Sequence, residues 1–171
     1  DQFDQGDQTL GEELAKKVAS AYASSELYRE NQERKDWLEV TLSSIGDGVI
    51  ATDELGRVNF INRTASELTG WKREEAIGEK VTDVFKIQNE ETHQPVANPI
   101  ERILETGEVV GLANHTILLT KDGREVPIDD NGSPIIGKNG NMLGAVLVFK
   151  DISERKYAEA QLLERERLFQ S

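Results

Sequence analysis

The sequence lacks cysteine altogether, and it contains no long hydrophobic run. Without cysteine the chain cannot form disulfide bonds, thiolate metal sites or a covalent cysteinyl-flavin bond. No apolar stretch approaches the roughly 20 residues that span a bilayer, and no signal-peptide pattern opens the sequence. We therefore expect a cytoplasmic location and no direct membrane contact. Any membrane anchor of a larger parent protein would lie outside this sequence.

Positive charge is also scarce. Lys and Arg together number 20, against 32 for Asp and Glu, so the net charge is -12. An acidic chain of this kind repels nucleic acid and anionic lipid, and no local basic patch offsets the repulsion. Hydrophobic residues make up 37% of the chain, which is enough for one modest core. The length of 171 residues then predicts one domain with extensions.

Glycine and proline are absent between Gly11 and Gly46, which predicts one long helix, or two end to end, over residues 12–45. A continuous helix of that length would span on the order of 50 Å. Apolar and small residues follow a weak seam with a phase break near residue 30, and they are Leu14, Val18, Ala21, Ser25, Tyr28, Leu38, Leu42 and Ile45. We predict a parallel homodimer through this helix. A solvated helix that packs on its own domain at one end is the alternative.

The next part of the chain has the pattern of a small α+β domain. Alternating apolar residues and turn signals predict five strands, at residues 48–53, 58–61, 109–120, 124–136 and 141–150. Asn98, Pro99 and Glu101 begin a clear helix that Gly107 ends, and shorter helices precede it. We expect an antiparallel sheet with helices on one face. Because the last strand is apolar on both faces, we expect the long helix or a partner's copy to cover the other face.

The last strand runs without slack into a second charged helix, and the junction is Asp151-Ile152-Ser153-Glu154-Arg155. A short acidic side chain at this position can cap free backbone N–H groups, and Glu154 would lie near the positive end of the helix dipole. A strand that continues directly into a helix, with no loop between them, can transmit a mechanical change. Asp151, Ile152, Ser153 and Glu154 are therefore the candidate relay residues, with ordinary capping as the alternative.

The order of these elements resembles a PAS domain, and so do specific residues. The segments Gly48 to Asp53, Gly56 to Val58 and Asn62 to Trp71 resemble its first half, and Ile77-Gly78 with Val84-Phe85 its middle. Lys121 to Gly123 and Asp151 to Arg155 resemble its last hairpin and its exit motif. The resemblance implies a PAS fold at 46–151, a linker or coiled-coil helix at 1–45 and a signalling helix at 152–171.

The flanks carry further resemblances. Residues 14–30 resemble the last helix of a GAF domain, and residues 164–169 resemble the lead-in to another PAS domain or to a kinase dimerisation helix. Together they imply a stretch of a multidomain bacterial signalling protein, a sensor histidine kinase, in which a downstream output domain is the partner.

Few residues suggest a ligand. We expect His115 on a strand face with Ala113, Ile117 and Leu119, where it would be a pocket ligand or a satisfied sheet residue. We expect Ile100, Ile103 and Leu104 to line any pocket between helix and sheet. In haem-binding PAS domains the axial histidine usually lies on that helix, and residues 98–106 contain none, which argues against haem. Trp37 and Trp71 fit packing better than flavin stacking, so the cofactor stays unknown.

Catalytic chemistry finds little support. His93 lies in a polar loop, without the helical context of a phosphoacceptor. Asp129 and Asp130 are adjacent on a strand, so they point to opposite faces and only one can face a pocket. No phosphate loop, zinc spacing or nucleophile elbow occurs. We therefore expect no enzyme but a signal-relaying module, with or without a small-molecule ligand. The alternative is a structural dimerisation module with a filled pocket.

Overall fold

The computed structural model describes residues 2–44, 46–111 and 115–170. They form two compact units, one ending at Thr41 and the other beginning at Leu42. The first unit is formed by α1 (Gln2–Ser44), a single 43-residue helix whose last three residues belong to the second unit. It begins at Gln2 rather than at Glu12 as predicted, because a glycine inside a helix costs only about 1 kcal/mol relative to alanine. Gly6 and Gly11 therefore do not end it.

The predicted helical seam is only partly described. Leu14, Val18 and Leu38 are exposed in the single chain. The side chains of Tyr28 and Leu42, and the whole of Ile45, lie outside the described residues. The parallel homodimer through this helix stays a prediction.

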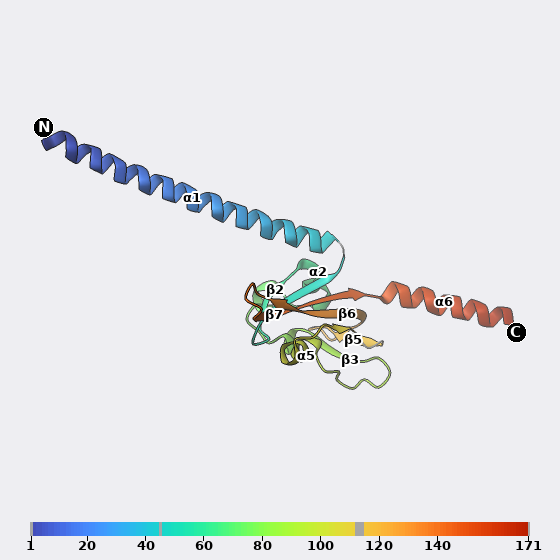
Figure 1. Cartoon of the computed structure of the whole chain (residues 1–171). Coiled ribbons are helices and arrows are strands. Elements are labelled where there is room, and N and C mark those ends of the chain that lie inside the picture. The colour runs from blue at the N-terminus through green and yellow to red at the C-terminus, as the bar shows by residue number, and fades with distance from the viewer. Residues whose placement is uncertain (1, 45, 112–114, 171) are drawn as a thin grey trace. The chain divides into compact units, whose positions relative to one another are not determined.

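The second unit is an antiparallel sheet with helices, as the sequence predicted (Figure 1). Its strand order is β2-β1-β7-β6-β5-β3, and β4 pairs with another part of β6. The strands are β1 (Gly48–Asp53), β2 (Val58–Ile61), β3 (Lys86–Asn89), β4 (Val110–Gly111), β5 (Thr116–Leu119), β6 (Glu125–Ile136) and β7 (Met142–Asp151). The helices are α2 (Arg63–Thr69), α3 (Arg73–Ala76), α4 (Val81–Val84), α5 (Pro99–Thr106) and α6 (Ser153–Gln170).

The count of five strands was too low, since the described residues form seven. Strand β3 was missed because Ile87 is its one apolar residue, and the strand exists through its pairing with β5. Within the predicted strand at 109–120, the described residues form β4 and β5, and Ala113, expected on one face with His115, lies outside the described residues. His115 precedes β5 with a φ of 74°, outside the extended region, so the expectation that it lies on a strand face was wrong.

Local capping signals were confirmed. The Asn62 Oδ1 accepts a hydrogen bond from the Ala65 N–H at the start of α2, and the Asn98 Oδ1 accepts one from the Ile100 N–H at the start of α5. Gly70 and Gly107 end these helices in the left-handed conformation that glycine adopts without strain. These caps fix the entry of two helices that pack on the sheet.

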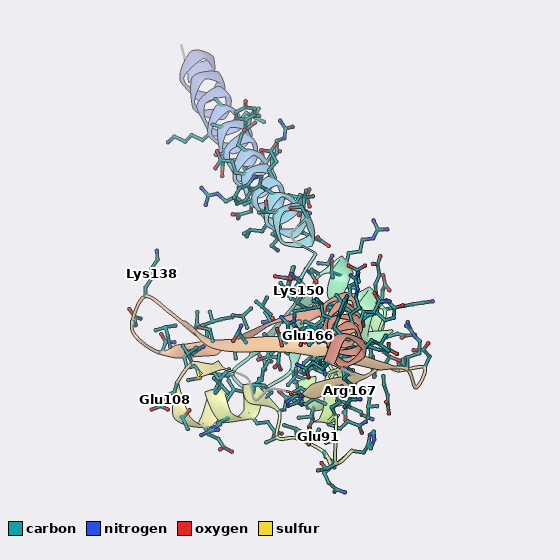
Figure 2. All side chains as sticks on the ribbon, turned by 90° about the vertical axis from the view of Figure 1, so that its right-hand side faces the viewer. Glu91, Glu108, Lys138, Lys150, Glu166 and Arg167 are labelled. Carbon is teal, nitrogen blue, oxygen red and sulfur yellow. The ribbon has the colours of Figure 1, made fainter. Side chains whose placement is uncertain are left out.

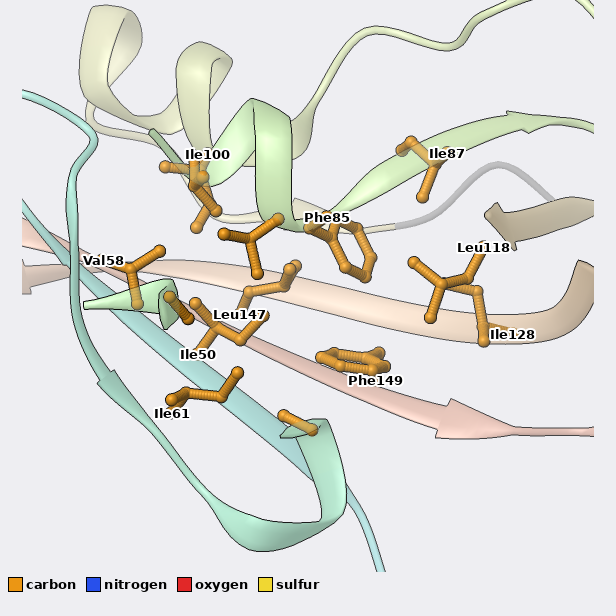
Figure 3. Packing of buried hydrophobic residues seen from close by; sticks show 14 of the residues in the cluster. Ile50, Val58, Ile61, Phe85, Ile87, Ile100, Leu118, Ile128, Leu147 and Phe149 are labelled. Carbon is orange, nitrogen blue, oxygen red and sulfur yellow. The ribbon is translucent and has the colours of Figure 1, made fainter. Parts of the chain in front are cut away.

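The core lies on one face of the sheet, where α5 contacts β6 and β7 and α2 contacts β1. Figure 3 shows Phe85 beside Phe149 among buried aliphatic residues, and the two ring centroids are 4.9 Å apart. The packing is tight. A Cβ added at Gly132 on β6 would lie 2.4 Å from the Ile103 Cδ1. Helix α5 is thus held directly against the backbone of β6.

The two edges of the sheet are covered by the chain itself. Beside β2, the Val58 N–H donates to the Glu79 carbonyl, and the Gly78 N–H donates to the Val58 carbonyl. Beside β3, the Val96 N–H donates to the Ile87 carbonyl. Covered edges do not invite pairing with another chain.

The opposite face of β7 carries Val146 and Val148, which are half-buried. This agrees with the apolar pattern on both faces of that strand. The prediction that the long helix or a partner's copy covers this face is not tested by the second unit alone.

Candidate functional site

A cleft of about 290 Å³ lies beside the beginning of α5. It is lined by Thr82, Phe85, Lys86, Ile87, Gln88, Pro95, Val96, Ala97, Asn98, Glu101 and Leu119. The predicted pocket residues Ile100, Ile103, Leu104 and His115 are not part of this lining. Ile100 and Ile103 are fully buried instead, and Leu104 packs against the same core. These side chains fill the space between α5 and the sheet.

The Glu90 carboxylate contacts two side chains near α6, those of His115 and Lys156. The His115 Nδ1 lies 3.3 Å from the Glu90 Oε2, and the imidazole side chain is 57% exposed. The Lys156 ammonium from the first turn of α6 binds the same Glu90 oxygen. The pKa of Glu90 is lowered, chiefly by the hydrogen bond from Lys156. His115 therefore lies at the surface rather than in the core, and it shares Glu90 with Lys156.

The junction at the end of β7 has the geometry of a cap. The Asp151 Oδ1 accepts hydrogen bonds from the Ser153 N–H at 2.8 Å and from the Ser153 hydroxyl at 2.5 Å. The predicted role of Asp151 as a cap agrees with this geometry. The Ser153 hydroxyl thus donates to the residue that caps the helix, and this bond ties the first residue of α6 to the end of β7. Glu154 is exposed in the first turn.

The first turn of α6 is also tied to β6. The Ile152 N–H donates to the Pro127 carbonyl at 3.0 Å, and the Ile152 side chain is buried. The Arg155 guanidinium lies 3.0 Å from the Asp129 carboxylate on β6. We call four contacts the exit clamp, and they are Asp151 with Ser153, Ile152 with Pro127, Arg155 with Asp129 and Lys156 with Glu90. Its backbone bond, ion pairs and apolar anchor join the first turn of α6 to the sheet.

Asp130 is the unusual group of the sheet. It lies on the inner face of β6 and is 1% exposed, and neither carboxylate oxygen has a hydrogen-bond partner among the described residues. Burial raises the pKa of Asp130 to about 7, and the neighbouring Asp129 adds to the rise. The prediction that the two acids point to opposite faces agrees with the structure. Val126 and Ile128 lie on the same face of β6 as Asp130, and their apolar side chains could have indicated that Asp130 is the buried acid.

The described part of the chain shows no metal site and no membrane-spanning helix. No group of three or more His, Asp or Glu side chains there could bind a metal ion. None of the helices described is both long and apolar enough to cross a bilayer. His93 lies exposed in the loop after β3, with its Nδ1 3.3 Å from the Gln88 Nε2.

Comparison with known proteins gives one family model, described as the PAS fold, which matches residues 38–152. Among curated proteins, the signal transduction histidine-protein kinase AtoS of Escherichia coli is 27% identical over 132 residues, or 76% of this chain and 20% of that protein. The sensor protein kinase WalK of Staphylococcus aureus is 27% identical over 149 residues, or 86% of this chain and 31% of that protein. The probable diguanylate cyclase DgcE of Escherichia coli is 25% identical over 130 residues, or 76% of this chain and 12% of that protein.

The chain thus spans less than a third of each of these relatives. Among solved structures, the PAS domain of a Colwellia psychrerythraea protein aligns with a TM-score of 0.50 and 25% identity, covering 64% of this chain and 88% of that one. A light-oxygen-voltage domain aligns with a TM-score of 0.53 and 19% identity, covering 74% of this chain and 92% of that one. The second likeness shows the fold alone.

Proposed function

Because the chain belongs to the PAS family, whose relatives here include sensor histidine kinases, we propose that it relays a signal through α6 to a downstream output domain. The coarser role of a sensor-type PAS domain follows from the family. The relay, the histidine kinase output and the homodimer through α1 are the proposal. The parts are then residues 1–45 as a linker helix, 46–151 as the PAS domain and 152–171 as the signalling helix.

The exit clamp is the observation that carries the proposal. A structural role alone needs only a capped helix, which Asp151 provides. The clamp adds Arg155 on Asp129 and Lys156 on Glu90, so the first turn of α6 is tied to β6 and to the residue that follows β3. A shift of either strand would therefore move the start of α6. Discrete contacts of this kind can bias a packed element between two arrangements.

The test is output from the full-length parent protein, measured as autophosphorylation at fixed protein and ATP concentrations. Asp151→Ala removes the acceptor of two hydrogen bonds, and the control Asp83→Ala removes an exposed carboxylate from the first turn of another helix, α4. We expect Asp151→Ala to lock or uncouple the output while the domain stays folded, and Asp83→Ala to leave it unchanged. Thermal melts of the 171-residue chain report folding in parallel.

The same variants separate capping from relay. Loss of the cap lowers the free energy of unfolding by roughly 0.5–2 kcal/mol in either case. Normal output from Asp151→Ala with only a lower melting temperature would leave Asp151 as a cap and would contradict the relay.

The alternative is a structural dimerisation module whose interior is filled by its own side chains. The fully buried Ile100 and Ile103 and the close contact of α5 with Gly132 favour it, since they fill the space between α5 and β6. Native mass spectrometry of the purified chain distinguishes the two. A bound small molecule supports ligand sensing. An empty dimer, together with full-length output that the clamp variants leave unchanged, supports the structural role.

A further inference from the structure

We propose that Asp130 is a proton-binding switch within the sheet, whose ionisation state sets how firmly the exit clamp holds α6. The inference deepens the proposed function, since it names a control on the same clamp. It stands on the position of Asp130, on the absence of partners for its carboxylate among the described residues, and on its proximity to two clamp anchors.

Among the residues that the structure describes, nothing compensates a charge on Asp130. Its carboxylate faces the interior from β6, directly opposite Phe149 on β7 in the strand register. Along the same face of β6 the neighbouring residues are Ile128 and Gly132, and Ile103 of α5 packs on Gly132. A carboxylate in such surroundings, whose oxygens have no hydrogen-bond partner among the described residues, is disfavoured over the neutral acid.

The charged groups on the surrounding elements do not neutralise it. Helix α5 turns Pro99, Ile100 and Ile103 toward the sheet, and its charged residues Glu101, Arg102 and Glu105 are exposed. The inner face of β7 carries Ala145, Leu147 and Phe149, with Lys150 and Asp151 exposed at its end, and β5 contributes buried Thr116 and Leu118. On β6 itself the charged neighbour is Asp129, which has the same sign. Burial and this neighbour together raise the pKa of Asp130 to about 7.

The switch is connected to the clamp through one stretch of β6. Asp129 adjoins Asp130 on the other face and binds Arg155, and the Pro127 carbonyl accepts the Ile152 N–H. When Asp130 loses its proton, the buried charge must gain water or move, and either change displaces this stretch. The protonated form therefore holds the clamp, and the ionised form loosens it. The relevant range lies around neutral pH, where a small change in pH alters the populations.

Nuclear magnetic resonance on the 171-residue chain tests this without any output domain, so its failure is separate from failure of the relay. The carboxyl carbon of Asp130 reports its own titration, and the backbone amides of Arg155 and Lys156 report the clamp. We expect both to change with one shared midpoint near pH 7. In Asp130→Asn the amide chemical shifts of Arg155 and Lys156 no longer change near pH 7, and their values match those of the wild-type chain at low pH.

Three further variants exclude other causes. In Asp129→Asn, Asp130 still titrates, at a lower midpoint because the like charge is gone. The amide chemical shifts of α6 no longer change with this midpoint. His115→Gln removes the imidazole beside Glu90 and leaves the shared midpoint in place. Lys150→Gln removes a cation opposite Asp129 that no clamp contact uses, and the amides still follow Asp130 (Figure 2 labels Lys150).

The contrary results are equally definite. An Asp130 carboxyl that titrates below about pH 5 would overturn the proposal, because the switch would always be ionised near neutrality. A change of the Arg155 and Lys156 amide chemical shifts near pH 7 that remains in Asp130→Asn, or that is lost in His115→Gln, would also overturn it, since another group would then control the clamp.

Discussion

Replacing Asp130 by Asn should change how the stability of the domain depends on pH. In the unfolded chain the carboxyl has its usual pKa of 3.8, and in the folded protein burial raises it to about 7. Between these values the unfolded chain releases its proton while the folded protein keeps it. The free energy of unfolding therefore falls as pH rises through this range and levels off above about 7.

The size of the effect follows from the shift. Each pKa unit corresponds to about 1.4 kcal/mol, so the full penalty at high pH is about 4 kcal/mol. About 2 kcal/mol of it should develop between pH 5.5 and pH 8.5. Asn has nearly the same shape and cannot ionise, so the stability difference, variant minus wild type, should grow by that amount across the interval.

Urea unfolding followed by far-ultraviolet circular dichroism at four or five pH values measures this difference. An offset of about 1–3 kcal/mol at all pH values is expected from the unpaired amide of Asn, and it does not affect the slope. Asp129→Asn, which removes the partly exposed carboxylate on the other face, should shift the midpoint downward without abolishing the slope. A difference between Asp130→Asn and wild type that stays constant with pH would refute the assignment of a neutral buried acid.

Three more predictions concern packing and assembly. Thr52→Val should raise the free energy of unfolding by about 1 kcal/mol in urea denaturation, because the buried Oγ1 has no hydrogen-bond partner among the described residues; a loss of stability would contradict this. Gly132→Ala should destabilise by about 1–3 kcal/mol through overlap with the Ile103 Cδ1, and clearly less in an Ile103→Val background that lacks this atom; equal losses in both backgrounds would show that the two residues do not collide. Sedimentation should give a dimer for the whole chain and a monomer for a chain that begins near Lys35, and two monomers would dismiss the helical interface.

The parts of the fold that sequence predicted are those specified locally. Asn62 and Asn98 cap their helices because each is a short polar side chain directly before a helical run. Asp122-Gly123 forms a turn because of the backbone preferences of these two residues. Strand β3 escaped prediction because its stability comes from β5, a partner distant in sequence. His115 escaped for a similar reason, since the break before β5 is not visible in the alternation of residue types.

The candidate site divides in the same way. The two-residue period of a strand placed Asp129 and Asp130 on opposite faces, and the spacing at Asp151 predicted a cap. The pairing of Arg155 with Asp129, and of Lys156 with Glu90, depends on where α6 meets the sheet, and only the structure supplies it. The raised pKa of Asp130 likewise depends on burial by α5 and β7, which no local pattern specifies.

A charge exchange across the exit clamp tests the relay most directly. Asp129→Arg and Arg155→Asp each break the 3.0 Å ion pair between β6 and α6, and together they restore it with reversed polarity. In the full-length parent protein, we expect each single variant to shift autophosphorylation to a locked level while the domain remains folded, and the double variant to return it toward the wild-type level. Wild-type output from both single variants, or an equal defect in the double variant, would contradict transmission through this contact.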